Sequence, residues 1–244
     1  MPKSLVDNAY RQIKDWIIRY HLKPGVRLHV KNLSQALGIS QTPVREALSM
    51  LEKENLIDRE PQKGFRVRSL SVQEIEDLYD LRVALEVLSA RQAAERITLH
   101  GRKRLTSLLS KVGRFIQSGN KPGILELEQD FHTIILEASG NRPLAEMGRA
   151  ILDRIWIIQN INLLTTDHLS DAHPQHVKVF EAIQKGDSQK AGLLMASHLK
   201  SAKEFVISRL KRSDDILSNL MGFPLQNGEH PERIPRVQRG SSKR

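Results

Sequence analysis

The chain has 244 residues, enough for one large domain or two modest ones, and its 39% hydrophobic and 27% charged residues are typical of a folded globular protein. It contains no cysteine, which excludes disulfides, thiol catalysis and thiolate metal sites. No stretch reaches the roughly 18 apolar residues of a membrane span, and residues 1–16 lack the apolar core of a secretion signal, so we expect a cytoplasmic protein with no membrane partner.

The net charge of +10 is concentrated near the N-terminus. Residues 1–70 contain 13 Lys and Arg against 7 Asp and Glu, an excess of +6, whereas residues 71–212 have an excess of only +3. The local pattern changes at the same boundary, because long helical patterns follow it and shorter ones precede it. A basic excess suits a polyanionic partner. We therefore expect two domains, 1–70 and 71–212, with a polyanion bound by the first.

The first domain is expected to begin with an amphipathic helix that ends before Pro24, followed by a short strand over 26–30. Two further helical patterns cover residues 31–37 and residues 41 to about 55. Between them, Gly38 suits the left-handed conformation that ends a helix. Two short helices joined by such a tight turn predict a helix-turn-helix.

The second of these helices has one apolar stripe, which leaves the polar residues of its N-terminal half facing solvent. In helix-turn-helix proteins this end enters the major groove of DNA. Arg45 can give two hydrogen bonds to a guanine edge, and Gln41 can pair with an adenine edge. The hydroxyls of Ser40 and Thr42 can hold phosphate, and Ser49 lies on the same side.

The turn and alternating run at residues 62–68 predict a hairpin that serves as a wing against the DNA backbone or minor groove. The predicted DNA contacts of this wing are Lys63, Gly64 and Arg66. Lys31, at the start of the first helix of the pair, is a further predicted phosphate contact. The alternative left open by these residues alone is a surface helix pair with ordinary solvated charges.

Several motifs of the first domain resemble a known family. These motifs are Pro24-Gly25, residues 33–38, the run Thr-Pro-Val-Arg-Glu-Ala-Leu at 42–48 and Gly-Phe-Arg-Val at 64–67. Over residues 5–70 they resemble the winged helix of the GntR family of bacterial transcription regulators, which implies a double-stranded DNA operator as partner. Gln41 stands where the family usually has Arg, which implies an altered base preference. Tyr20 stands where the family often has Gly.

The second domain is expected to be an all-α bundle. Ser71 to Glu74 has the form of a capping box that opens a helix. The chain then divides into about six helices at breaks near Gly101, 119–123, 140–143, 165–174 and 186–187. From residue 213 the pattern weakens, and we expect a disordered tail over 213–244. The predicted fold class is mainly α, a winged helix-turn-helix followed by a helical bundle.

Side chains that can bind a metal fall on stripes of the bundle expected to face its interior. Glu128 and His132 are four residues apart and so share a helix face, while His176 and His198 lie among apolar residues of two later helices. They can converge on one cation, with N and O donors suited to zinc, nickel or manganese. The alternative is that each histidine is a hydrogen-bonded residue of the core.

Three other polar residues of the bundle have open interpretations. Arg82 lies on an apolar stripe, where a charge is costly without a partner. A bidentate contact to a carboxylate ligand would satisfy it, and the alternative is an internal ion pair with Glu86 or another carboxylate. His168 and His173 fall in a stretch expected to be a loop, where we interpret both as solvated, with His173 as an alternative metal ligand.

The second domain also resembles a known family. The motifs are residues 81–86, the Glu128 to His132 segment ending in Ala-Ser-Gly-Asn at 138–141, and the later His176 and His198. Over residues 71–212 they resemble the FCD ligand-binding domain of the FadR subfamily. The resemblance implies a divalent metal held by one Asp and three His, and a small organic acid bound at the position of Arg82. Here Glu128 replaces the Asp, which moves the oxygen donor by about 1.5 Å.

These features together predict a homodimeric transcription regulator, more specifically a repressor, without catalytic residues. Two winged helices would engage a pseudo-palindromic operator, and a small carboxylate metabolite or a divalent metal in the bundle would change operator binding. For this, the ligand must bind one arrangement of the protein better than the other. Two alternatives stay open. One is a metal-dependent hydrolytic enzyme, because such a centre can activate water. The other is a metal-free regulator whose histidines bind the acid directly.

Overall fold

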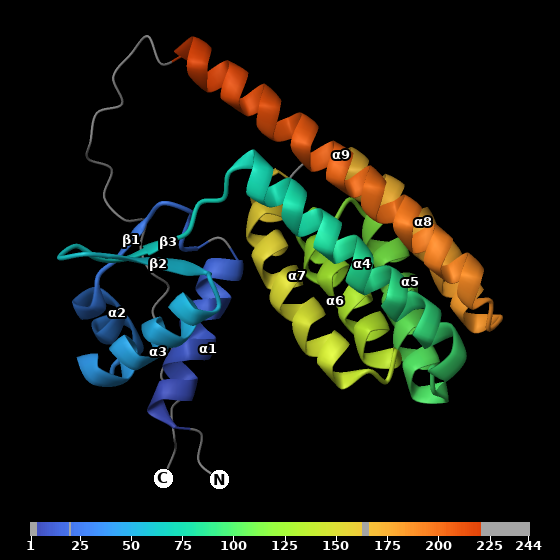
Figure 1. The fold of residues 1–244 in the computed structure, drawn as a ribbon, viewed down its shortest axis with the longest axis horizontal. Coiled ribbons are helices and arrows are strands. Elements are labelled where there is room, and N and C mark those ends of the chain that lie inside the picture. Colours follow the sequence, from blue (N-terminus) through green and yellow to red (C-terminus); the bar gives the residue numbers. More distant parts are fainter. Residues whose placement is uncertain (1–3, 20, 163–165, 221–244) are drawn as a thin grey trace. The chain divides into compact units, whose positions relative to one another are not determined.

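The computed structural model describes residues 4–19, 21–162 and 166–220, and the chain divides between Leu70 and Ser71 into two compact units (Figure 1). The first unit combines short helices with a small antiparallel sheet, and the second is entirely helical in its described part. The predicted fold class, a winged helix-turn-helix followed by a helical bundle, is confirmed. Within those ranges, every helix is too short or too polar to cross a lipid bilayer.

The first unit contains three helices and three strands in its described part. Its elements are α1 (Leu5–Ile18), β1 (Arg27–Leu28), α2 (Val30–Leu37), α3 (Gln41–Lys53), β2 (Ile57–Glu60) and β3 (Gly64–Val67). The apolar face of α1, with Ile13 and Trp16, is buried, and α1 contacts α3, whose Leu48 and Leu51 are buried too. This small core fixes α3, so that the opposite face of α3 is available to solvent.

The turn between α2 and α3 has the conformation that the sequence predicts. Gly38 adopts φ 67° at the end of α2, and its N–H donates to the carbonyls of Gln35 and Ser34. Glycine tolerates this left-handed conformation because it has no Cβ. The next residue, Ile39, donates its N–H to the Ser34 carbonyl at 3.1 Å. These contacts fix the angle at which α3 leaves the turn.

The wing is an antiparallel sheet in the order β1-β3-β2. Residues Ile57 to Glu60 of β2 pair with Val67 to Gly64 of β3. The strand expected over 26–30 is shorter, because β1 contains only Arg27 and Leu28 and α2 already begins at Val30. The sheet therefore forms the predicted hairpin with one short additional strand.

Over its described residues, the second unit contains six helices, in agreement with the about six that the sequence predicts. They are α4 (Val72–Arg96), α5 (Leu99–Gln117), α6 (Lys121–Ala138), α7 (Arg142–Asn162), α8 (Thr166–Gln184) and α9 (Ser188–Leu220). The predicted capping box is present, since the Ser71 hydroxyl accepts from the Glu74 N–H and the Glu74 carboxylate accepts from the Ser71 N–H. The first helix, α4, packs along α9 and also contacts α6, α7 and α8 (Figure 1). Its side chains can therefore face several other helices inside the bundle.

Two sequence predictions about this unit are wrong. The stretch 165–174 is not a loop in its described part, because α8 begins at Thr166 and carries Pro174 inside it. Proline removes one helical hydrogen bond, and burial of the following apolar residues of α8, including Val179 and Ile183, offsets that loss. The predicted tail starts too early, because α9 continues to Leu220. Residues 221–244 lie outside the described part of the chain.

Candidate functional site

The residues predicted to read DNA lie together on the exposed side of the N-terminal half of α3. Gln41, Thr42 and Arg45 are exposed, and Ser49 is partly exposed. Arg45 Nη2 donates a hydrogen bond to Gln41 Oε1 at 3.2 Å. Ser40 has the extended N-cap conformation, but its side chain makes no capping hydrogen bond. The hydroxyl of Ser40 is thus not used to cap the start of α3.

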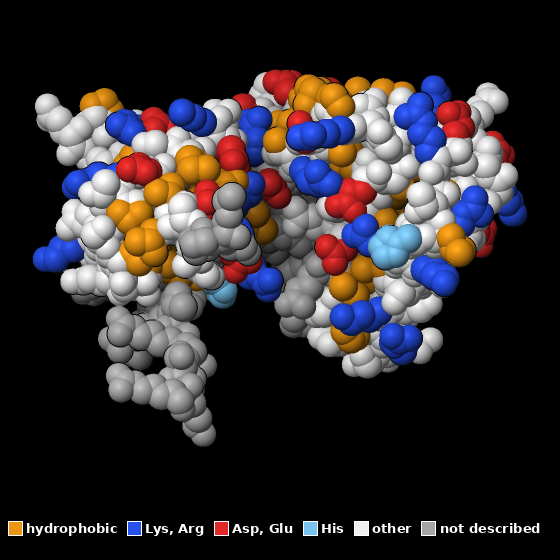
Figure 2. All heavy atoms as spheres, turned by 90° about the horizontal axis from the view of Figure 1, so that it is seen from below, with side chains coloured by type: hydrophobic (Ala, Val, Ile, Leu, Met, Phe, Trp, Pro, Cys, Tyr) orange, Lys and Arg blue, Asp and Glu red, His pale blue; other side chains and the backbone are white. Residues whose placement is uncertain are grey.

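Three further predicted contacts are exposed in the same unit. Lys63 and Gly64 lie at the tip of the wing, where Gly64 adopts φ 89°, and Lys31 lies in the first turn of α2. On the face seen in Figure 2, Lys and Arg side chains are interspersed with Asp and Glu instead of forming one patch. This face therefore shows no single basic patch, so DNA contact has to be argued from individual residues.

Arg66, also predicted to contact DNA, is held within the wing. Its Nε donates to Glu60 Oε1 at 2.7 Å, and its Nη1 donates to the Gly25 carbonyl at 2.8 Å. The hydrogen bond from Arg66 lowers the pKa of the Glu60 carboxyl. Arg66 thus ties β3 to β2 and to Gly25 in the turn before β1, which gives it a structural role in the wing.

The sequence interpretation missed Arg59, which links the wing to α3. Arg59 lies on β2, and it donates from Nε to Glu52 and from Nη2 to Ser49 Oγ, both at 3.1 Å. Its guanidinium also lies over the ring of Phe65, with 4.9 Å from Cζ to the ring centroid. No local pattern could indicate this contact, because it depends on how β2 folds back along α3.

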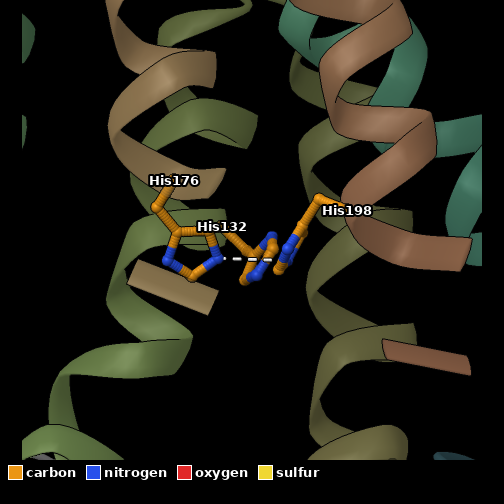
Figure 3. Close-up of side chains that lie close together, drawn as sticks. All are labelled: His132, His176 and His198. Carbon is orange, nitrogen blue, oxygen red and sulfur yellow. Dashed lines mark hydrogen bonds between the residues drawn. The ribbon is translucent and has the colours of Figure 1, made fainter. Parts of the chain in front are cut away.

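Inside the second unit, three histidines from three helices form one cluster (Figure 3). His132 comes from α6, His176 from α8 and His198 from α9, and all three are buried. Each can offer a ring nitrogen so that the three nitrogens lie within 4.8 Å of one another. His176 Nε2 and His198 Nε2 are 3.0 Å apart. The structure therefore brings together the three histidines predicted as metal ligands.

Glu128, the predicted oxygen donor, lies beside this cluster. One turn before His132 on α6, it places Oε1 3.5 Å from His176 Nε2, and its side chain is 11% exposed. Burial raises the pKa of Glu128 to about 7, although the charge of Arg82 opposes the shift. Binding of a nearby cation would therefore readily displace the proton of this carboxyl group.

Two further side chains orient the histidine rings. Glu86 Oε2 is 2.5 Å from His132 Nδ1, and Gln175 Oε1 is 3.0 Å from His198 Nδ1. A carboxylate or amide oxygen at Nδ1 favours the tautomer in which Nδ1 carries the proton and Nε2 has a free lone pair. Phe131 stacks on the His176 ring at a centroid distance of 3.9 Å. The rings are thus fixed by hydrogen bonds and packing.

Two of the three histidines, His132 and His176, are held in the uncharged form that binds metals. Burial lowers the pKa of His132, against the opposing effect of Glu86, and lowers that of His176 well below its usual value, with the neighbouring histidines and Arg82 adding to the effect. Neutral imidazole is the ligating form. The cluster can therefore offer uncharged nitrogens at neutral pH.

The donor set fits a divalent transition metal. Metal–nitrogen bonds of about 2.1 Å separate neighbouring donors by about 3.0 Å at a right angle and about 3.4 Å at a tetrahedral angle. The 3.0 Å between His176 and His198 and the 3.5 Å between Glu128 and His176 match these separations. Three imidazoles and one carboxylate suit zinc, nickel and manganese. Such a cation would add a concentrated positive charge and an open position for an anionic ligand.

Arg82 pairs with Glu86 and still has an unused donor. Arg82 Nε lies 2.5 Å from Glu86 Oε1, so the alternative of an internal ion pair is part of the structure. Arg82 Nη1 is nevertheless buried and has no hydrogen-bond partner among the described residues. A buried donor without a partner is costly. The internal pair therefore does not exhaust the hydrogen-bonding capacity of Arg82.

His173 differs from the prediction of a solvated loop residue. It lies within α8, is only partly exposed, and its Nδ1 is buried without a partner among the described residues. The expectation failed because Pro174 was taken to mark a loop, whereas the helix continues through it. The side chain of His168 lies outside the described residues.

The second unit also contains a contact that the sequence analysis did not foresee. Glu86 was considered only as a partner of Arg82, yet it also binds His132, which is 46 positions away. Gln175, the partner of His198, was not considered at all. Helical spacing can pair residues within one helix, but it does not show which residues of another helix lie opposite.

These features are typical of one class of protein, in which a DNA-reading unit is joined to a helical sensor unit. Family comparison agrees with both halves. Residues 5–67 match the model of the bacterial regulatory proteins of the gntR family, and residues 77–201 match the FCD domain. The chain belongs to the GntR family and carries an FCD domain. It is a DNA-binding transcription regulator.

Relatives and solved structures support this assignment. The chain is 31% identical over 202 residues to the transcriptional repressor GlaR of Escherichia coli, covering 79% of this chain and 91% of that protein. It is 28% identical over 191 residues to the regulator YdhC of Bacillus subtilis, covering 78% and 85%. The structure of E. coli McbR/YncC shares the fold, with a TM-score of 0.77 at 24% identity over 85% of this chain and 99% of that one. The alternative of a metal-dependent hydrolytic enzyme is therefore wrong.

Proposed function

We propose that the chain is a cytoplasmic repressor whose operator binding responds to a divalent metal and a small carboxylate held in the helical unit. The metal would be bound by Glu128, His132, His176 and His198, and the carboxylate by Arg82. The observation that carries this proposal is the unpartnered Nη1 of Arg82, buried close enough for its charge to lower the pKa of Glu128 and of His176. A buried guanidinium with a spare donor next to a cation site favours an anionic ligand.

The proposal that the chain represses transcription rests on the names of its relatives. GlaR and RspR of E. coli are named as transcriptional repressors, and RspR is 27% identical over 215 residues of this chain. A homodimer with two winged helices would match a pseudo-palindromic operator, because the two-fold symmetry of the protein is then repeated in the DNA. A ligand would cause release of the operator if it bound more tightly to the arrangement of the protein that does not bind DNA.

Base reading is proposed for Arg45 and Gln41, which are exposed at the N-terminal end of α3. Contacts to phosphate are proposed for Lys31, Ser40, Thr42, Ser49 and for the wing residues Lys63, Gly64 and Arg66. The engagement of Arg66 by Glu60 and Gly25 favours an indirect role, in which it holds the wing that presents Lys63.

Two steps test the proposal. Genomic fragments bound by the full-length protein are selected first, and the affinity for the best fragment is then measured by fluorescence anisotropy with zinc, nickel or manganese and a panel of small carboxylates. We expect at least one metal and carboxylate combination to weaken operator binding. Operator binding that no metal or acid changes would count against ligand control, while leaving DNA reading established.

A metal-free regulator is the second candidate, favoured by the 3.0 Å contact between His176 Nε2 and His198 Nε2. Two neutral imidazoles can form this contact as a hydrogen bond, in which the Nε2–H of one ring donates to the Nε2 lone pair of the other. In that case the histidines would bind the acid directly. Elemental analysis of protein purified without chelator distinguishes the two candidates, because only the first predicts close to one metal per chain.

A further inference from the structure

Glu86 lies between the two proposed ligand positions and contacts a residue of each. Its Oε1 is 2.5 Å from Arg82 Nε and its Oε2 is 2.5 Å from His132 Nδ1. The side chain is 2% exposed, so water does not compete for either oxygen. One carboxylate therefore satisfies a donor on the proposed anion side and a donor on the proposed cation side.

Glu86 fixes the orientation of both partners. By accepting the Nδ1 proton of His132, it leaves the Nε2 lone pair of that ring directed to the cluster. By accepting from Arg82 Nε, it fixes the plane of the guanidinium and leaves Nη1 as the spare donor. Both groups would lose this orientation together if the carboxylate were removed.

The charge of Glu86 is shared between these partners. Arg82 is permanently charged and its Nε lies 2.5 Å from Glu86 Oε1, so this buried pair holds Glu86 as a carboxylate. A cation bound at Nε2 would withdraw electron density from the His132 ring and make its Nδ1–H a stronger donor. The carboxylate of Glu86 would then interact more strongly with His132, and the positive charge of Arg82 would be less completely neutralised.

We propose that Glu86 is a positioning residue that couples the two ligand positions, so that occupation of the histidine centre is transmitted to Arg82 and increases its affinity for an anion. Because binding free energies are reciprocal, an anion at Arg82 would tighten the cation in the same proportion. This inference rests on the proposed function and adds to it the residue through which metal and acid would cooperate.

The test uses the full-length protein and zinc as the probe. Zinc affinity is measured by competition with a chromophoric chelator, and the ring nitrogens of His132 and the Arg82 Nε–H are followed by nitrogen NMR. In the wild type we expect His132 to be protonated at Nδ1 and the Arg82 Nε–H resonance to shift when zinc is added. Glu86→Gln should weaken zinc binding by about 10-fold to 100-fold and abolish the shift at Arg82.

Gln175→Ala is the matched control. Gln175 orients His198, another histidine of the cluster, and among the described hydrogen bonds its side chain has none to Arg82. It should weaken zinc binding to a similar extent while the zinc-dependent shift at Arg82 persists at saturation. Since Glu86→Gln leaves Arg82 as a buried charge, the double variant Arg82→Gln, Glu86→Gln provides a second test of zinc affinity in a neutral core. It should bind zinc as weakly as the single Glu86 variant.

The outcomes separate this inference from the proposed function. Zinc binding by the wild type, with unchanged affinity in both Glu86 variants or with an Arg82 shift that survives Glu86→Gln, would overturn the coupling role alone. Absence of zinc binding by the wild type, with nickel and manganese equally inactive, would overturn the metal part of the proposed function and the coupling role together.

Discussion

His176 on α8 and His198 on α9 place their Nε2 atoms 3.0 Å apart inside the helical unit. Without a cation, the Nε2–H of one ring must donate a hydrogen bond to the Nε2 lone pair of the other, since two lone pairs facing each other repel. With a cation, both Nε2 atoms must present lone pairs to it. The contact between these two rings is thus the point at which the metal-free and metal-bound forms of the site differ most.

Removal of the metal should destabilise the helical unit. A metal present at 100 times its dissociation constant stabilises the folded state by about 2.7 kcal/mol. We therefore expect chelator to lower the unfolding temperature of the wild type and to leave His198→Ala unaffected, because that variant lacks one ligand. His100→Ala, which changes an exposed histidine of α5, should behave like the wild type. Equal chelator effects in both variants would exclude His198 as a ligand.

How much of this site can be predicted from the sequence depends on whether its residues lie on one helix or on different helices. Helical periodicity is sufficient to place Glu128 and His132 on one face, because residues four apart are neighbours on a helix. It places His176 and His198 on inward stripes that can converge, but it cannot show that α8 and α9 bring them to the same point, and the FCD resemblance supported that expectation. The partners Glu86 and Gln175 were missed because they meet the histidines across helices. Pro174 led to the wrong prediction of a loop, because the packing of α8 outweighs the local tendency of proline to interrupt a helix.

Glu128 should make the stability of the metal-free protein depend on pH. Its pKa is raised from 4.5 to about 7 by burial, so the folded state binds this proton more tightly than the unfolded state. That contribution is fully present below pH 4.5 and is lost as pH rises through 7. Glu128→Gln, which cannot ionise, should therefore be more stable than the wild type in chelator at pH 8, by up to about 3 kcal/mol.

Urea unfolding of both proteins across pH 4.5 to 8 measures this difference. The low pKa values of His132 and His176 act in the opposite direction, because protonation below about pH 6.5 disfavours the folded state. The comparison with Glu128→Gln isolates the carboxyl, since both proteins keep these histidines. Added zinc should reverse the order of stability, because only the glutamate can supply a charged oxygen donor. Parallel stability curves would show that Glu128 titrates normally.

Arg45 and Lys63 should contribute differently to operator binding. Arg45→Ala should cost about 1 to 3 kcal/mol and relax specificity at one base, because it removes a contact to a guanine edge. Lys63→Ala should weaken binding to all sequences and reduce the salt dependence by about one unit, because it removes a phosphate contact. Lys53→Ala, a change of an exposed lysine in the last turn of α3, is the matched control. Affinity titrations at several salt concentrations distinguish these effects.

Gln41 should determine how this chain departs from the base preference of its family. Gln41 Oε1 accepts a hydrogen bond from Arg45 Nη2 at 3.2 Å, so the two exposed side chains form one continuous surface. An amide pairs best with adenine and a guanidinium with guanine. Selection of bound sequences with Gln41→Arg should therefore replace adenine by guanine at one position of each half-site. Gln35→Arg, which changes an exposed glutamine of α2, should leave the selected sequence unchanged. An identical preference in the wild type and Gln41→Arg would show that Gln41 does not read a base.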